Sequence, residues 1–198
     1  MNVALRVPTL TREQFLAWVE NQDESFEFDG FQPVAKNGGN VTHNAICQNL
    51  WAALRVRLKG GKCTPMGPDI AVATIGDAIR YPDALVTCTP VDGDVRIVPG
   101  VVTVFEVLSP TSGRVDRIDK VREYAAVPTI LHYVLIERTS AALTSFHRTS
   151  GHLPWNADIK TGDEVLPLPE IGIELPVAEL YEAVSLPNST ATPDPASA

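Results

Sequence analysis

Between Lys62 and Val107 the sequence contains no helical period, only short β-type runs separated by turn residues. The runs occupy residues 69–73, 81–88, 95–98 and 101–107. Short runs of this kind are typical of strands, and Asp92-Gly93 between two of them favours a tight turn. This segment therefore predicts a mostly antiparallel part of a β-sheet.

Helical patterns precede this block. A capping box at residues 11–14 is followed by apolar residues at helical spacing, and residues 25–34 alternate around a turn signal as in a hairpin. Thr42 is placed to cap a second helix that ends at Gly60-Gly61. The apolar stripe of that helix consists of Ile46, Leu50, Leu54 and Leu58. We expect this helix to pack by that single stripe.

The second half of the chain also combines helix and strand. A third helix is expected over residues 116–126 and stops before Pro128. The near-continuous apolar run at 131–136 predicts a buried central strand, and 142–146 predicts another strand. A helical segment is expected near 176–184. The order of these elements indicates an α/β fold.

Length and composition limit the organisation of the chain. Its 198 residues, 44% of them apolar, suffice for one sizeable core and are few for two. We expect one domain over residues 1–186 and a disordered tail over 187–198, where small, polar and proline residues dominate. Neither a membrane-spanning stretch nor a signal peptide is visible. We therefore expect a soluble, cytoplasmic protein with no membrane partner.

The three cysteines, Cys47, Cys63 and Cys88, are odd in number and lack a short paired spacing. Disulfide frameworks and zinc clusters use paired cysteines at characteristic spacings. We therefore predict neither, and interpret all three as small core residues.

The net charge of −8 argues against a nucleic-acid partner, since phosphate binding requires clustered bases. However, eight acids and one lysine lie from Asp158 onward, so the first 157 residues are nearly neutral. Bases also gather locally at 55–62 and at 114–122. The first cluster is most simply a solvated helix face, whereas the second lies next to the acids described below.

Two acids, Asp83 and Glu106, lie on or beside apolar β-type runs, where carboxylates are rare. If the two runs pair with both side chains on one face, carboxylates about 4 Å apart repel by about 4 kcal/mol at an effective dielectric near 20. Such a pair shares a proton, finds cations or binds a metal. Without His or Cys at ligand spacing, oxygen ligands favour Mg²⁺ or Mn²⁺ over Zn²⁺. An ion so held can polarise a phosphodiester and activate water.

Each of these residues also has a structural interpretation. Asp83 can be a turn residue, and Glu106 can form an ion pair with Arg117. Glu27 is a weaker candidate, because alternation in a hairpin exposes half of its residues at no cost. His43 is expected at the surface or at the helix cap.

Seven short motifs follow one another along the chain. They are Phe26-Glu27-x-Asp29-Gly30, His43-x-x-Ile46, Pro82-Asp83, Glu106-Val107-Leu108-Ser109-Pro110-Thr111, Asp116-x-x-Asp119-Lys120-x-x-x-Tyr124, Val127-Pro128 and His132-Tyr133-Val134-Leu135. In this order and spacing, from about residue 11 to residue 184, the chain resembles the Uma-two family of bacterial restriction-endonuclease-like proteins. The resemblance implies the PD-(D/E)XK nuclease fold, an α/β domain whose central mixed sheet is flanked by helices.

The resemblance also implies a catalytic site. Asp83 and Glu106 would bind the metal together with the backbone carbonyl of Val107, and Glu27 would be the upstream acid that completes the site. The implied activity is Mg²⁺-dependent hydrolysis of phosphodiester bonds in DNA, with Mn²⁺ as a possible substitute. Related nucleases often work as pairs, so a homodimer is expected.

One residue departs from the nuclease motif. Leu108 stands where the motif normally has its lysine. In this family the lysine comes from the following helix, which makes Lys120 the candidate, with Tyr124 one turn later in support. A lysine among carboxylates stays protonated, so its expected role is electrostatic.

Two alternatives remain open at this point. The chain can be a non-catalytic module that keeps the nuclease fold for binding or assembly, a hypothesis motivated by Leu108 and by the acidic balance. It can also be a metal-dependent nuclease that acts on RNA or on small nucleotides, which the sequence does not distinguish from DNA.

Overall fold

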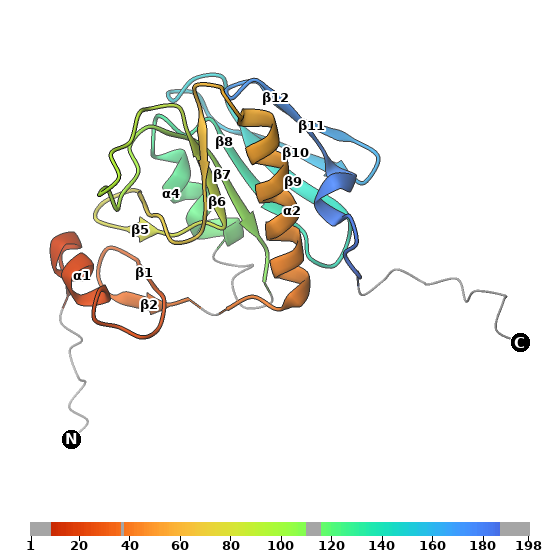
Figure 1. The fold of residues 1–198 in the computed structure, drawn as a ribbon. Coiled ribbons are helices and arrows are strands. Elements are labelled where there is room, and N and C mark those ends of the chain that lie inside the picture. The colour runs from red at the N-terminus through yellow and green to blue at the C-terminus, as the bar shows by residue number, and fades with distance from the viewer. Residues whose placement is uncertain (1–8, 37, 110–115, 187–198) are drawn as a thin grey trace, which may run out of the picture.

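The computed structural model describes residues 9–36, 38–109 and 116–186 (Figure 1). A six-stranded sheet of order β10-β9-β8-β7-β6-β3 forms its centre. The strands are β3 (Thr64–Met66), β6 (Ala84–Thr87), β7 (Val101–Val107), β8 (His132–Ile136), β9 (Ala142–His147) and β10 (Asn156–Thr161). β7 and β8 are parallel, and the other neighbours are antiparallel. The sheet is therefore mixed, as the resemblance implied.

Helix α2 (Val41–Leu58) crosses one face of this sheet (Figure 1). Its apolar stripe of Ile46, Leu50, Leu54 and Leu58 is buried, as predicted. The same face is covered by the hairpin of β11 (Val165–Leu168) and β12 (Ile173–Pro176) and by the 3-10 helix η2 (Val177–Tyr181). These elements and the sheet enclose the largest core cluster.

The opposite face is covered by a π-helical turn, η1 (Asp116–Lys120), which leads into α4 (Val121–Ala125). This segment forms the crossover between β7 and β8, since parallel neighbours cannot be joined by a tight turn. Tyr124 packs there against Tyr133 of β8, with ring centroids 4.8 Å apart. The helix predicted over 116–126 thus exists, although its first turn is π-helical.

A smaller sheet lies beside the central one, with the strand order β2-β1-β5-β4. Its strands are β1 (Phe26–Phe28), β2 (Pro33–Ala35), β4 (Val72–Ala73) and β5 (Ile79–Arg80). Helix α1 (Arg12–Val19) packs on it, and Phe15 stacks on Phe28 with centroids 4.9 Å apart. The hairpin at 25–34 and the capping box of Thr11 are both confirmed.

Several local predictions were wrong. Asn40, rather than Thr42, caps α2, because its side chain accepts a hydrogen bond from the backbone of His43 at 3.0 Å. Residues 95–98 form no strand beyond one isolated bridge between Ala71 and Ile97. β3, β10, β11 and β12 were not predicted. Three of these strands are exposed or interrupted by proline, so their sequences carry little hydrophobic signal.

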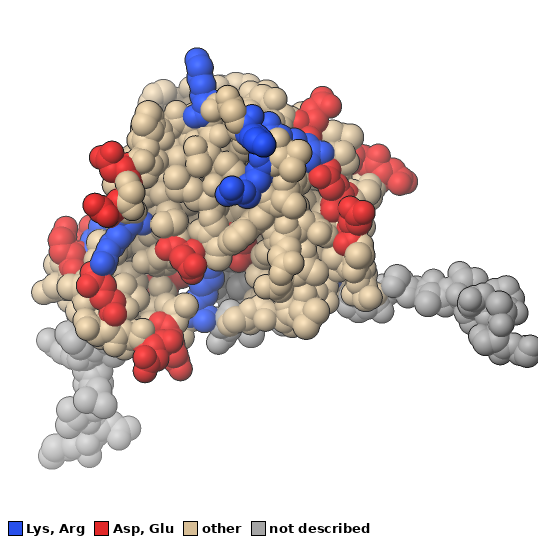
Figure 2. Space-filling view, in the orientation of Figure 1, with Lys and Arg blue, Asp and Glu red and all other residues tan. Residues whose placement is uncertain are grey.

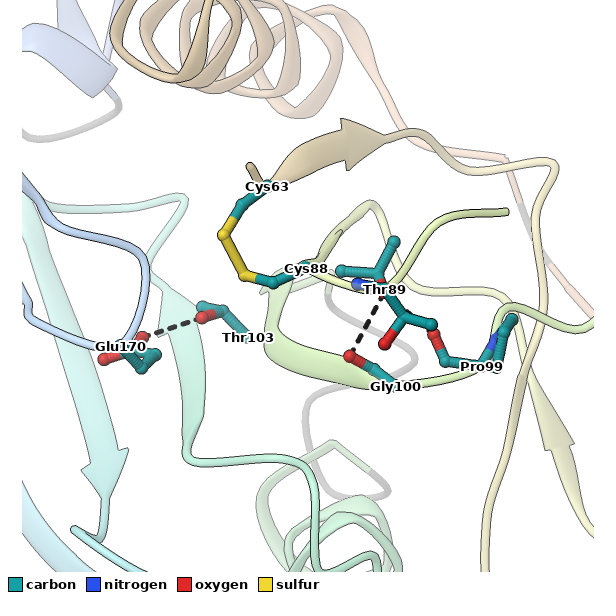
Figure 3. The surroundings of a disulfide bond; sticks show 8 residues. Cys63, Cys88, Thr89, Pro99, Gly100, Thr103 and Glu170 are labelled. Carbon is teal, nitrogen blue, oxygen red and sulfur yellow. Dashed lines mark hydrogen bonds between the residues drawn. A yellow bond between two sulfur atoms is a disulfide. The ribbon is translucent and has the colours of Figure 1, made fainter. Parts of the chain in front are cut away.

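The cysteine prediction was also wrong, because Cys63 and Cys88 form a disulfide bond (Figure 3). Thr64 of β3 pairs with Thr87 of β6, so the cysteines one residue beyond this pair face each other. Cys47 is the free cysteine. The bond joins two cysteines that are 25 residues apart in the chain, one beside β3 and the other beside β6.

We expect removal of this disulfide in a Cys63→Ser/Cys88→Ser variant to lower the free energy of unfolding by about 3 kcal/mol, because the unfolded chain regains loop entropy. Chemical denaturation of both proteins measures the difference. A reductant should lower the stability of the wild-type protein to that of the variant and leave the variant unchanged. Equal stability of oxidised wild type and variant would contradict the prediction.

No helix within the described part of the chain is long and apolar enough to cross a membrane. The tail expected from residue 187 lies outside the described residues.

Candidate active site

The two acids singled out in the sequence meet at the end of the β6–β7 pair. Ala84 pairs with Phe105, so Asp83 and Glu106, one residue further on, face each other across the strands. Both side chains are on the same face, as side-chain alternation requires. Both residues are buried, with 6% and 4% of their surface exposed. The backbone N–H of Val107 donates to Oδ2 of Asp83 at 2.8 Å, which orients this carboxylate.

Lys120 reaches the site from η1. Its Nζ lies 2.7 Å from Oε1 of Glu106 and 3.2 Å from Oε1 of Glu27, and its side chain is 5% exposed. The hydroxyl of Tyr124, four residues later, donates to the same Oε1 of Glu106 at 3.3 Å. Leu108 packs into the core beneath these groups, in the cluster that contains Tyr124. The ammonium group absent at position 108 is therefore supplied from position 120.

Glu27 is brought to the site by the pairing of β1 with β5, where Phe28 lies opposite Ile79. Its carboxylate accepts hydrogen bonds from Arg80 Nη1 at 3.1 Å and from the backbone of Tyr81 at 3.3 Å. Burial by itself raises the pKa of Glu27, but the charges of Lys120, Arg80 and Lys36 outweigh it, and its pKa is lowered. Glu27 is thus ionised and belongs to the same buried network as Glu106.

Arg80 and Glu123 extend this network and were not predicted. Arg80 forms two hydrogen bonds with Glu123, from Nη2 at 2.6 Å and from Nε at 2.7 Å. Burial lowers the pKa of Arg80, but the hydrogen bonds and charges of Glu123 and Glu27 raise it overall. The sequence signal was a base inside the short apolar run at 78–81, the same kind of signal that identified Asp83.

Helix α2 contributes a second set of contacts to Asp83. His43 Nε2 lies 3.2 Å from Oδ2 of Asp83, and Trp51 Nε1 donates to its backbone carbonyl at 2.9 Å. Cys47 lies between them on the helix, with Sγ 3.6 Å from His43 Nδ1. Burial, Asp83 and Glu106 raise the pKa of the Cys47 thiol. The i, i+4, i+8 spacing of these three residues, next to the apolar stripe, was the available signal.

Three sequence interpretations are corrected by these contacts. His43 is partly exposed but does not cap α2, which Asn40 does, and its side chain contacts Asp83. The preference for Mg²⁺ over Zn²⁺ assumed that no histidine or cysteine lies at ligand spacing. His43 and Cys47 do lie at such a spacing, next to Asp83. Arg117 forms an ion pair with Glu137 and not with Glu106.

The pKa of Asp83 is lowered by its partners. Burial raises it, but the hydrogen bond and charge of His43, the charge of Lys36 and the backbone N–H of Val107 together outweigh burial. Asp83 is therefore a carboxylate in a largely dehydrated position, and its charge is available to a cation.

The site opens into a cleft of about 710 Å³ between the small sheet, α2 and the end of β7. Five acids and two lysines are among its lining residues: Glu24, Glu27, Asp69, Asp83, Glu106, Lys36 and Lys120. Figure 2 shows acidic and basic side chains side by side on the lower part of this face, while other bases gather at the upper end. The excess of acids makes the cleft attractive to cations.

The family model described as "Putative restriction endonuclease", Uma2, matches residues 12–178. The chain belongs to this family. An uncharacterized protein of Synechocystis sp. is 29% identical over 180 residues, which cover 90% of this chain and 94% of the relative. A crystal structure from Anabaena variabilis, described as a putative nuclease belonging to DUF820, superimposes with a TM-score of 0.66 at 15% identity. The superposition covers 87% of this chain and 98% of the Anabaena chain, so the two proteins share a fold.

Membership in the Uma2 family confirms the resemblance drawn from the seven motifs. The six-stranded mixed sheet with few helices and the superposition on the Anabaena protein confirm the restriction-endonuclease-like fold. In this member of the family, Glu27, Asp83, Glu106 and Lys120 line one cleft.

Proposed function

We propose that this Uma2 protein is a Mg²⁺-dependent endonuclease that hydrolyses phosphodiester bonds in DNA. The observation that carries this proposal is the convergence of Glu27, Asp83, Glu106 and Lys120 in one acidic cleft. Acids are seldom buried unless they are paired or bind a metal. Here Lys120 contacts two of the three acids, Glu27 and Glu106, while Asp83 contacts His43.

The donor set fits a hard divalent cation. Asp83 and Glu106 present carboxylate oxygens from adjacent strands, and Val107, whose backbone N–H contacts Asp83, also lines the cleft. Oxygen ligands of this kind suit Mg²⁺ or Mn²⁺. These three residues would hold the metal, which when bound supplies Lewis-acid polarisation of the phosphodiester and a more acidic water.

The other residues of the cleft hold these groups in place and supply charge. Lys120 and Tyr124 fix the orientation of Glu106 through contacts to its Oε1. His43 and Trp51 position Asp83 from α2. The ammonium group of Lys120 stabilises the negative charge that develops on the phosphate, because a preorganised cation in a water-poor site acts strongly.

The acidic cleft also explains why a metal is required for binding the substrate. Three more acids than lysines line it, so the free cleft repels a phosphate, and a divalent ion reverses this repulsion. Exposed bases elsewhere on the molecule, among them Arg55 and Lys59 near the end of α2, are available to the DNA backbone. We further propose a cytoplasmic homodimer, in which two sites cut two strands.

Calorimetry with Mg²⁺ and Mn²⁺, together with cleavage assays on DNA, tests this function. The wild-type protein should bind metal and cleave DNA only when metal is present. Asp83→Asn should lose both, because the amide offers no charge to the cation, while Asp158→Asn on the exposed strand β10 should retain both. Metal binding and cleavage that persist in Asp83→Asn would refute the proposed site.

Leu108 favours one second candidate, a non-catalytic module that keeps the nuclease fold for binding or assembly. Absence of binding at millimolar Mg²⁺ or Mn²⁺ supports this alternative over the nuclease. Competition among DNA, RNA and nucleotides for cleavage separates the proposed substrate from the other two classes. Preferential cleavage of RNA or of nucleotides would identify that class, rather than DNA, as the substrate.

A further inference from the structure

His43 and Cys47 lie one turn apart on α2 and face Asp83. One ligand atom from each of the three residues lies within 4.8 Å of the others. His43 and Cys47 are partly exposed and line the same cleft as the acids. An imidazole, a thiol and a carboxylate therefore converge at a solvent-accessible position, and the proposed Mg²⁺ chemistry leaves the thiol without a role.

The spacing of the nitrogen and sulfur atoms suits a tetrahedral metal. Bonds of about 2.05 Å to nitrogen and about 2.3 Å to sulfur separate the two ligand atoms by about 3.6 Å at the tetrahedral angle. The distance from His43 Nδ1 to Cys47 Sγ is 3.6 Å. The other ring nitrogen, Nε2, contacts Asp83, an arrangement in which a carboxylate orients a metal-binding histidine.

Gly39 leaves the Nδ1 side of the imidazole open. A Cβ atom at residue 39 would lie 2.3 Å from Nδ1 and 2.5 Å from Cγ of His43. Any larger residue would therefore displace the ring from its present position. The glycine keeps the space next to the candidate ligand atom available.

We propose that His43, through Nδ1, and Cys47 bind a thiophilic divalent cation of the zinc class, with Asp83 as the carboxylate that orients His43 through Nε2. A coordinating thiol is deprotonated by the metal and releases its proton to solvent, so a neutral Cys47 in the free protein is compatible with binding. The site shares Asp83 with the proposed Mg²⁺ site. If that function holds, zinc and magnesium compete for this carboxylate, and zinc inhibits cleavage.

Co²⁺ is the probe for this site, since cobalt bound to a thiolate gives a charge-transfer absorption band. The wild-type protein should show the band, and Zn²⁺ should abolish it. Cys47→Ser should lose the band and bind Zn²⁺ at least about tenfold more weakly. The Cys63→Ser/Cys88→Ser variant should keep the band. An unchanged band in Cys47→Ser, or no binding by wild type below millimolar metal, would overturn the proposal.

Gly39→Ala provides a second variant that leaves every ligand in place. It should weaken Zn²⁺ binding through displacement of His43, whereas Gly38→Ala, where a Cβ meets nothing within 4 Å, should not. Equal zinc affinity of these two variants would contradict the assigned geometry.

Glu106→Gln separates this site from the proposed function. It should keep the cobalt band and lose Mg²⁺ binding. For the wild-type protein, a cobalt band without Mg²⁺ binding would support the zinc-class site and refute the Mg²⁺ nuclease. Mg²⁺-dependent cleavage by a wild-type protein that gives no cobalt band would support the nuclease and overturn the zinc-class site.

Discussion

Glu106→Gln is expected to reduce metal-dependent DNA cleavage by at least about a hundredfold, the scale of a lost preorganised electrostatic contact. The substitution removes the charge that a divalent cation requires and leaves a weaker, neutral acceptor for Lys120 and Tyr124. Glutamine has nearly the same shape as glutamate, so the packing of β7 should remain. The loss should therefore appear in the reaction rate rather than in the fold.

The matched control is Glu170→Gln, which changes another buried glutamate on the opposite face of the sheet. Glu170 accepts a hydrogen bond from Thr103 at 2.7 Å and contacts His132 at 3.1 Å, away from the cleft. Initial rates of plasmid cleavage at saturating Mg²⁺, with thermal melts of both variants, give the comparison. Equal rates for the two variants would exclude Glu106 from the catalytic site.

Lys120→Met is expected to lower the free energy of unfolding by about 3–5 kcal/mol near neutral pH, because it leaves buried carboxylates without their cation. Glu106 loses a contact of 2.7 Å and Glu27 loses one of 3.2 Å. Arg80 still compensates Glu27. The main cost of the substitution should therefore fall on Glu106.

The pH dependence of this variant follows from Glu27. The pKa of Glu27 is lowered in the folded protein. Its ion pairs therefore stabilise the folded protein fully at pH values above the usual carboxyl pKa, and this stabilisation is lost as the pH falls through the lowered pKa. Without Lys120 this pKa rises, and protonation relieves the buried charge. The stability deficit of Lys120→Met should therefore shrink as the solution is acidified.

Urea denaturation of wild type and variant between pH 4 and 8 measures this effect. Lys160→Met is the control, because Lys160 lies at the surface and pairs with Glu164 at 3.3 Å. An exposed pair of this kind contributes little to stability, because solvent screens the two charges. A deficit for Lys120→Met that equals that of Lys160→Met, or that grows on acidification, would contradict the buried network.

The acids of the site could be predicted from the sequence because their context is local. Asp83 and Glu106 stand out against apolar strands, and antiparallel neighbours joined by a short connection pair in a predictable way. Lys120 was assigned through the resemblance to the Uma2 family, and Tyr124 was added by helical spacing, which brings residues four apart to one face. The selection of Asp83, Glu106 and Tyr124 needs only the few residues on either side.

The partners of these acids could not be predicted in the same way. Glu27 meets Arg80 across 53 positions because the two-residue strand β5 pairs with β1, and so short a strand has almost no sequence signal. The Cys63–Cys88 bond was missed for the same reason, since it depends on the short strand β3. His43 was interpreted by its position on a helix rather than by the strand it faces.

Isolated charges in apolar runs were thus sufficient to select Asp83 and Glu106, because this signal is a property of a single strand. The nuclease fold and Lys120 followed from the order and spacing of the motifs that resemble the Uma2 family. The docking of α2 and of the small sheet against the end of β7 adds His43, Cys47 and Arg80 to the site. Those contacts depend on how separate elements pack, and packing minimises the free energy of the whole chain rather than of any single segment.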